Sequence, residues 1–481
     1  EQARQALDFV LDNLNDEDRF NVIAFSTATQ AYARDLVWAD ERGEARDFVR
    51  RLEANGSTDI NRALLEAAAM AGEERPTTII FLTDGLPTVG EVDVDRIIDN
   101  VAGAAAENVR IFPFGVGYDV NTLLLDTIAQ NHRGASGYVR PEEAIDEKVS
   151  AFYAKVSTPL LADLALDLGQ VRTGDVYPYP LPDLFAGSQL VVVGRYRDGG
   201  ETTVRLTGEV NGEEQVFEYE GVRLAAAGDG GAGGGGAFIA RLWATRKIGY
   251  LLQQIRLHGE ERELVDEVVE LSVRYGIITP YTSFLVEEPE MALSEEGRAQ
   301  IVETVEVEAP AAAAGQDAVN RSEGEKLLSQ AEAPAPLPTM TAGPAGTGGG
   351  QAVASPVRYV GDKTFLLHDG VWTDTTFDAD RMETVPVGFG SDDYFALLAA
   401  RPTWGPYLAL GEHVIVVLEG TAYEVREGEA PPLVLPAGAG EPEADEPAPP
   451  PAQEDEPDNL FDVIVQAIVD LFEAIVDAFR K

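Results

Sequence analysis

Hydrophobic residues along residues 1–156 follow two alternating patterns. Short, nearly continuous runs of Val, Ile and Phe occupy residues 20–25, 78–82 and 109–116, as is typical of strands buried on both faces. Between these runs, as over residues 60–71, apolar residues recur every three or four positions, which predicts amphipathic helices. The alternation predicts an α/β fold in which helices cover both faces of a Rossmann-like parallel sheet.

The pattern changes after residue 156. Residues 157–290 predict a β-rich region with helices, because short strand-like runs come first and longer helical patterns follow. The strand-like runs are residues 164–168, 190–196 and 202–207, and the helical patterns are residues 238–257 and 261–274.

Aromatic residues indicate how the rest of the chain is organised. None occurs from Leu285 to Arg358, so we predict that residues 291–355, rich in Ala, Pro and Gly, form a disordered linker. Aromatic residues return in residues 356–427, which we predict to be a small α+β domain. Residues 428–458 are rich in acids and prolines, a composition that favours an extended tether.

Residues 459–481 predict a terminal amphipathic helix with one apolar stripe and an acidic opposite face. The acidic face argues against membrane contact. We expect the stripe to dock within the chain or to mediate self-association. The stripe consists of Phe461, Val465, Ile468, Phe472, Ile475 and Phe479.

Charge and composition narrow the classes of partner. The chain has 481 residues, which predicts several domains, and its 36 basic and 83 acidic residues give a net charge of −47. This charge argues against binding to nucleic acid or to anionic lipid and favours cations. The chain has no Cys and 4 His, so thiol chemistry is excluded and a His-based metal or catalytic site is disfavoured.

Two loops carry the candidate chemistry. Thr58 precedes a predicted helix and Asp84 follows a predicted buried strand. Both positions belong to the carboxyl edge of a parallel sheet, where open α/β folds place their ligands. A hydroxyl and a carboxylate suit Mg²⁺, Mn²⁺ or Ca²⁺. The simpler alternative is that no ligand binds here. Thr58 would then belong to a helix cap and Asp84 to a turn.

Several segments together resemble a known family. The segments RFNVIAFST (19–27), NGSTDINRAL (55–64), TIIFLTDGLPT (78–88) and VRIFPFGVGYDVN (109–121) resemble a von Willebrand factor type A domain. Later segments resemble the region that follows this domain in inter-alpha-trypsin inhibitor heavy chains and their bacterial relatives. They are STPLLADL (157–164), YPYPLPDLFAGSQLVVVGRY (177–196), ARLWATRKIGYLLQQIRLHG (240–259) and RYGIITPYTSFLV (274–286).

The resemblance implies a metal-ion-dependent adhesion site. By the family pattern, Thr58 would bind the metal directly and Asp84 would act through water. The family's Asp-x-Ser-x-Ser loop does not occur in this sequence. We therefore expect an N-terminally truncated chain that lacks the first strand of the sheet. An intact parent would bind Mg²⁺, Mn²⁺ or Ca²⁺, whereas this chain would bind a cation weakly or not at all.

The resemblance further implies a non-enzymatic function. We expect an adhesion module, extracellular or on a bacterial cell surface, whose metal holds an acidic group of a protein partner. One alternative is an intracellular scaffold or assembly factor that uses the same domain. Another is a metal-dependent hydrolase, but no general base converges with Thr58 and Asp84 in the sequence.

Overall fold

The computed structural model describes most of the chain between residues 2 and 431. The described residues are 2–53, 56–72, 75–156, 159–185, 189–210, 213–225, 235–282, 297, 312–335, 356–379, 381–428 and 430–431. The predicted terminal helix over 459–481 and nearly all of the predicted tether over 428–458 lie outside these residues. In the described part of the chain, no helix is long and apolar enough to cross a membrane.

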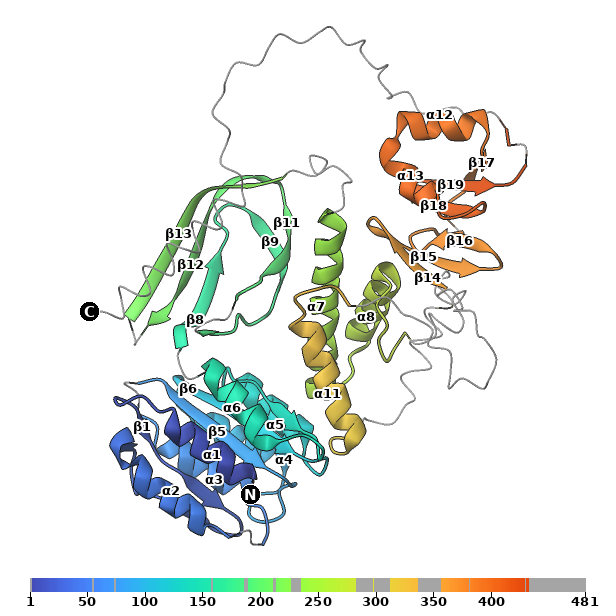
Figure 1. Cartoon of the computed structure of the whole chain (residues 1–481). Coiled ribbons are helices and arrows are strands. Elements are labelled where there is room, and N and C mark those ends of the chain that lie inside the picture. The colour runs from blue at the N-terminus through green and yellow to red at the C-terminus, as the bar shows by residue number, and fades with distance from the viewer. Residues whose placement is uncertain are drawn as a thin grey trace.

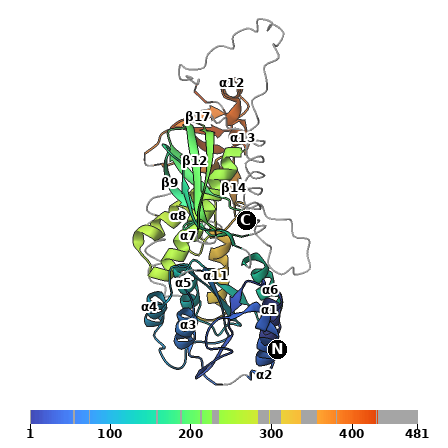
Figure 2. The same cartoon turned by 90° about the vertical axis from the view of Figure 1, so that its left-hand side faces the viewer.

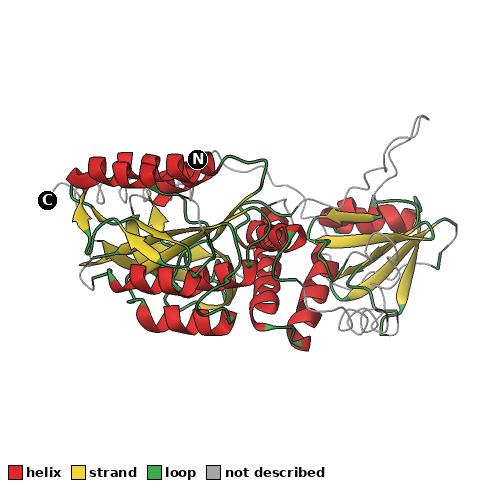
Figure 3. Cartoon of the chain, turned by 90° about the horizontal axis from the view of Figure 1, so that it is seen from below, coloured by secondary structure: helices red, strands yellow, loops and turns green. Residues whose placement is uncertain are grey.

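A parallel sheet organises the N-terminal unit, as predicted. Its order is β5 (Thr77–Thr83), β6 (Val109–Val116) and β7 (Gly137–Val139). Six helices accompany it: α1 (Gln2–Asp12), α2 (Arg42–Arg51), α3 (Ile60–Ala69), α4 (Val94–Ala104), α5 (Thr122–Asn131) and α6 (Ile145–Val156). Figures 1 and 3 show helices on either side of these strands.

Alternate residues of the strands face opposite helices. Ile79 and Ile111 pack with α3, α4 and α5, whereas Phe112 and Phe114 pack with α1 and α6. The strands are therefore buried on both faces, which is why their sequences are nearly continuous in apolar residues. The predicted α/β class is confirmed.

Two short antiparallel pairs extend this unit. Strands β1 (Arg19–Phe20) and β4 (Val37–Trp38) form one pair, and β2 (Ile23–Phe25) and β3 (Thr29–Ala31) form the other; the short helix η1 (Ala39–Glu41) follows β4. Among the described residues β5 pairs only with β6, so the parallel sheet ends at β5. The rings of Phe25 and Phe81 stack with centroids 5.2 Å apart. The β2–β3 pair thus meets β5 through side chains, in agreement with a sheet that lacks its first strand.

The next region is β-rich and ends in two helices, as predicted. Sheet order β10-β8-β12-β13 joins Leu184–Phe185, Pro159–Asp167, Gly200–Val210 and Glu213–Leu224, and β11 (Val193–Arg197) pairs with β9 (Arg172–Tyr177). The helices are α7 (Gly235–His258) and α8 (Arg262–Tyr275). Helix α8 ends at Gly276, whose φ of 62° is the left-handed conformation that favours glycine after a helix.

The C-terminal domain is a mixed six-stranded sheet with helices. Its strand order is β14 (Val357–Val360), β15 (Lys363–His368), β16 (Val371–Asp374), β18 (Val414–Leu418), β19 (Thr421–Arg426) and β17 (Thr384–Gly388). The helices are α12 (Asp392–Ala400), η3 (Pro402–Trp404) and α13 (Gly405–Leu408). The Thr364 hydroxyl donates to the Arg274 carbonyl oxygen at 2.6 Å, so this domain packs on α8.

One prediction about the linker was wrong. Helix α11 (Gln316–Ser329) lies within the predicted disordered segment 291–355 and packs between α5 and α7, as Figures 1 and 2 show from two sides. The helix has little apolar periodicity, because its buried face is largely polar and includes Ser322 and Glu325. A polar face that is buried through ion pairs gives no hydrophobic pattern, so the composition alone suggested disorder.

Candidate functional site

Thr58 lies in a short loop that leads into α3. Asp59 caps this helix, since its carboxylate accepts a hydrogen bond from the Arg62 amide at 3.1 Å. A side chain at Gly90 would collide with this cap: a Cβ there would lie 2.5 Å from Asp59 Oδ1, and Gly90 has a φ of 75°. The cap therefore fixes the position of Thr58. A helix cap at these polar residues is also what the simpler interpretation of this segment predicted.

The loop after β5 is hydrogen-bonded to the Thr58 backbone. The Thr58 amide donates to Thr88 Oγ1 at 2.9 Å, and the Thr88 amide donates to the Thr58 carbonyl oxygen at 3.0 Å. A Cβ built on Gly85 would lie 3.4 Å from Thr58 Oγ1, in ordinary contact. The structure thus brings the Thr58 loop and the Asp84–Gly85 loop together, with Asp84 exposed to solvent.

The turn between β2 and β3 joins the same edge. The Asp59 amide donates to the Ser26 carbonyl oxygen at 3.0 Å. Thr27 Oγ1 lies 3.2 Å from where a Cβ on Gly56 would stand. Sequence analysis singled out neither Ser26 nor Thr27, although the dipeptide directly follows a predicted strand and could have been placed at the carboxyl edge by the same reasoning as Asp84.

A metal ion fits only part of this arrangement. Thr58 and Asp84 offer a hydroxyl and a carboxylate, which are oxygen ligands of the kind that Mg²⁺ and Ca²⁺ take. Among the described residues, no group of three His, Cys, Asp or Glu could hold a metal ion. Divalent cations of this class take six or more oxygen ligands. A complete site would need oxygens beyond those two side chains.

Distant residues also reach this edge. The loop after β6 donates and accepts hydrogen bonds with the segment before α11: the Thr122 amide donates to the Ala313 carbonyl oxygen at 2.8 Å, and the Gly315 amide donates to the Tyr118 carbonyl oxygen at 2.9 Å. The segment before α11 therefore supports the loop after β6. This loop neighbours the candidate site because β6 is the strand beside β5.

A buried charge cluster then continues along α11. The Asp126 carboxylate on α5 is surrounded by donors from three other elements, and the side chain is 5% exposed. The donors are Tyr138 Oη at 2.8 Å, Ser322 Oγ at 2.6 Å, Lys326 Nζ at 2.8 Å and Arg256 Nη2 at 2.7 Å. Glu325 in turn accepts from Arg256 Nε at 2.6 Å.

The pKa values of this cluster reflect burial and pairing. Burial alone would raise the pKa of Asp126, but Lys326 and Arg256 outweigh it and lower the pKa to about 2. Burial raises the pKa of Glu325 to about 6, against the opposing effect of Arg256. Sequence analysis did not predict this cluster. A signal existed: Asp126 interrupts an apolar stretch, LLLDTIA (123–129).

Comparison with known proteins identifies the class of the N-terminal unit. The von Willebrand factor type A domain family matches residues 1–137. A von Willebrand factor type A structure from Catenulispora acidiphila is 19% identical, with a TM-score of 0.41, and the match covers 68% of this chain and 83% of that chain. The family match places a von Willebrand factor type A domain at residues 1–137.

Curated relatives narrow the identification. Inter-alpha-trypsin inhibitor heavy chain H2 of Sus scrofa is 28% identical over 308 residues, covering 60% of this chain and 32% of that protein. Heavy chain H3 of Mesocricetus auratus is 31% identical over 307 residues, covering 60% of this chain and 35% of that protein. The chain is thus similar to inter-alpha-trypsin inhibitor heavy chains over 60% of its length, and it spans about a third of the length of these relatives.

Proposed function

We propose that this chain is a protein-interaction module that binds its partner through the loops at the carboxyl edge of the β5–β6–β7 sheet. One observation carries the proposal: the Thr58 backbone and Thr88 exchange hydrogen bonds that hold two loops together, while Asp84 between them stays exposed. Loops held on a rigid sheet are the usual place for recognition residues.

The surface beside Asp84 has the mixed character of a binding surface. Leu86 is 40% exposed and Val92 is 51% exposed, and both belong to the segment between β5 and α4. Apolar side chains beside a carboxylate and hydroxyl groups suit a protein partner, since interfaces combine an apolar centre with polar groups around it. The proposal is of binding and assigns no catalytic residue.

Metal dependence is the finer part of the proposal. Once further oxygen ligands complete the site, Thr58 would bind Mg²⁺, Mn²⁺ or Ca²⁺ directly, and Asp84 would act through a bound water. The cation would hold an acidic group of the partner at a free coordination position. A location outside the cell or on its surface also belongs to the proposal, as the family resemblance of the sequence implies.

Capture of partners from the source cell's extracellular and surface proteins tests the proposal. The immobilised chain is compared with Asp84→Ala and Leu86→Ala, and with Glu107→Ala as a matched control. Glu107 is an exposed carboxylate directly before β6, at the opposite edge of the sheet. We expect the wild type and Glu107→Ala to retain the same proteins, and the two edge variants to lose them. Equal retention by all four chains would contradict the proposal.

A further inference from the structure

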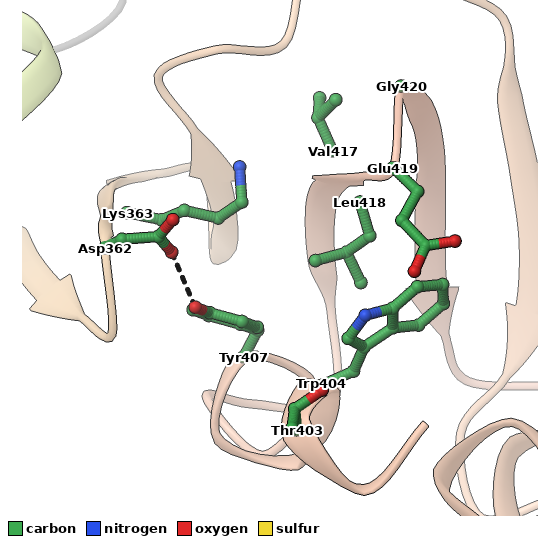
Figure 4. A pocket seen from close by; sticks show the side chains of 9 residues that line it. All are labelled: Asp362, Lys363, Thr403, Trp404, Tyr407, Val417, Leu418, Glu419 and Gly420. Atoms are coloured by element: carbon green, nitrogen blue, oxygen red, sulfur yellow. Dashed lines mark hydrogen bonds between the residues drawn. The ribbon is translucent and has the colours of Figure 1, made fainter. Parts of the chain in front are cut away.

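The C-terminal domain contains a cavity of about 380 Å³ that is distant from the edge described above. It opens between the β14–β15 turn, the β18–β19 turn and the η3–α13 segment (Figure 4). Its size lies within the range of small-molecule sites, roughly 300–1,000 Å³. Leu418 gives it an apolar face, and its other walls carry charged and hydrogen-bonding groups.

One wall is fixed by Tyr407 and Asp362. The Tyr407 hydroxyl donates to Asp362 Oδ1 at 2.6 Å, as the dashed line in Figure 4 marks. Gly361 makes this contact possible, because a Cβ there would lie 2.3 Å from the Tyr407 hydroxyl oxygen, and its φ is 59°. Burial raises the pKa of Tyr407, so the hydroxyl stays protonated and remains a donor. Asp362 keeps further lone pairs for another donor.

The neighbouring lysine is held as firmly. Lys363 Nζ lies 2.7 Å from Asp374 Oδ2, and Asp374 is fully buried. The Val417 amide also donates to Asp374 Oδ2, at 3.0 Å. These contacts, with a longer one from Lys363 Nζ to Thr376 Oγ1 at 3.4 Å, fix the ammonium group at the cavity wall, where one N–H donor remains unused.

Trp404 supplies an unused donor on the opposite wall. The side chain is 7% exposed, and among the described residues its indole N–H has no hydrogen-bond partner. Figure 4 shows the nitrogen on the side of the ring that faces Tyr407 across the cavity. Tyr423 and Arg401 lie over the ring, at 5.4 and 5.8 Å from its centroid. Trp404 therefore offers the cavity a donor rather than a stacking face.

The cavity thus presents both donors and acceptors. Lys363 and Trp404 can donate, whereas Asp362 and Glu419 can accept. Two carboxylates repel an anion. A cation is disfavoured because the Lys363 ammonium would repel it and because it would leave the indole N–H of Trp404 unpaired. In addition, Glu419 already pairs with Arg401 at 3.2 Å. A hydroxyl group both donates and accepts, so a ring that carries several hydroxyls can pair with donors and acceptors together.

We propose that this cavity binds a neutral polyhydroxyl ring, that is, a sugar residue. The apolar ring positions would lie against Leu418. The hydroxyls would donate to Asp362 and Glu419 and accept from Trp404 and Lys363. This site is independent of the interaction edge of the N-terminal domain, since none of its lining residues belongs to that domain.

Saturation-transfer NMR on the full chain tests the proposal, with D-glucose, D-galactose, D-mannose, D-xylose and N-acetyl-D-glucosamine as probes. Choline, acetate and N-methylacetamide serve as cation, anion and amide comparisons. We expect saturable binding of at least one sugar and none of the three comparison compounds. Absence of saturation transfer from every sugar, or stronger binding of a comparison compound, would overturn the proposal.

Variants then locate the site. Trp404→Phe keeps the ring and removes the donor, so we expect about tenfold weaker sugar binding, whereas Trp372→Phe, at a buried Trp outside the cavity, keeps wild-type binding. Glu419→Gln changes an exposed turn residue and cannot unfold the core, and we expect weaker binding than in its control Glu412→Gln. Wild-type affinity in both Trp404→Phe and Glu419→Gln would overturn the assignment of the cavity.

Discussion

Asp126 Oδ2 and Arg256 Nη2 form an ion pair of 2.7 Å although 130 residues separate them in the sequence. Their side chains are 5% and 10% exposed. One belongs to α5 of the von Willebrand factor type A domain and the other to α7, so the pair joins that domain to the following helices. Helix α11 closes the pair from a third side through Ser322 and Lys326.

Replacement of Asp126 by Asn should destabilise the protein strongly. Lys326 and Arg256 would then be buried without their shared counter-charge, and breaking a buried pair in this way costs about 3–5 kcal/mol. Urea unfolding of the wild type and the variant measures the change. Asp99→Asn, at an exposed position of α4, is the control and should change the free energy of unfolding by less than about 0.5 kcal/mol. A small effect at Asp126 would mean that the cluster is better hydrated than its burial indicates.

Glu325 should make the protein more stable as the pH falls, whereas an acid whose pKa is lowered by folding makes it less stable. Its folded-state pKa of about 6 lies above the ordinary value of 4.5. The folded protein therefore binds a proton more tightly than the unfolded chain does. This contribution to stability is complete below pH 4.5 and is lost as the pH rises through about 6.

The variant Glu325→Gln isolates this contribution. Between pH 7 and pH 4.5 the wild type should gain stability relative to Glu325→Gln by about 2 kcal/mol, from a shift of about 1.5 pH units. Parallel pH profiles of the unfolding free energy for the two proteins make the comparison, since all other acids are shared. Asp126, with its lowered pKa, contributes in the opposite sense, and its stability is lost only as the pH falls from 3.8 toward about 2. Parallel profiles between pH 4.5 and 7 would show that Glu325 titrates normally.

Gly249→Ala should loosen α11 selectively. A Cβ at this position of α7 would lie 2.2 Å from the Ser329 amide nitrogen, so the backbone of α11 would have to move. We expect faster amide hydrogen exchange over residues 316–329, with little change in β5 and β6. Gly103→Ala in α4, where a Cβ meets nothing within 4 Å, is the matched control and should leave exchange in α11 unchanged. Unchanged exchange in Gly249→Ala would contradict the close approach of the two helices.

Thr58→Ala and Asp84→Ala should abolish what Mg²⁺ binding this chain has. With two side-chain oxygens brought together, we expect a dissociation constant no tighter than about 10⁻³ M, the weak end of protein cation sites. Calorimetric titration with MgCl₂ measures it, with Glu107→Ala as the control. Tight binding that Thr58→Ala abolishes would mean that further ligands complete the site.

The sequence predicted those features that depend on local periodicity. The runs that became β5 and β6 were recognised because burial on both faces makes them continuously apolar, and the positions of Thr58 and Asp84 followed from the geometry of parallel strands. Helix α11 and the Asp126 cluster were missed, because their interactions join residues up to 200 positions apart. Pairing of that kind leaves no periodic signal in a single sequence. Trp404 is one of the aromatic residues that return in residues 356–427, and its unpaired N–H follows from tertiary contacts that the sequence does not show.

The order of residues in the Asp126 cluster also governs when it can form during synthesis. Lys326 follows Asp126 by 200 residues, and at translation rates of roughly 5–20 residues per second this interval lasts on the order of 10–40 s. Until Arg256 is synthesised, Asp126 can pair only with its near neighbours Ser136 and Tyr138, and Lys326 follows Arg256 by a further 70 residues. The nascent N-terminal domain therefore carries a carboxylate whose ion-pair partners come only from later sequence, and the cluster stays incomplete until Lys326 has been synthesised.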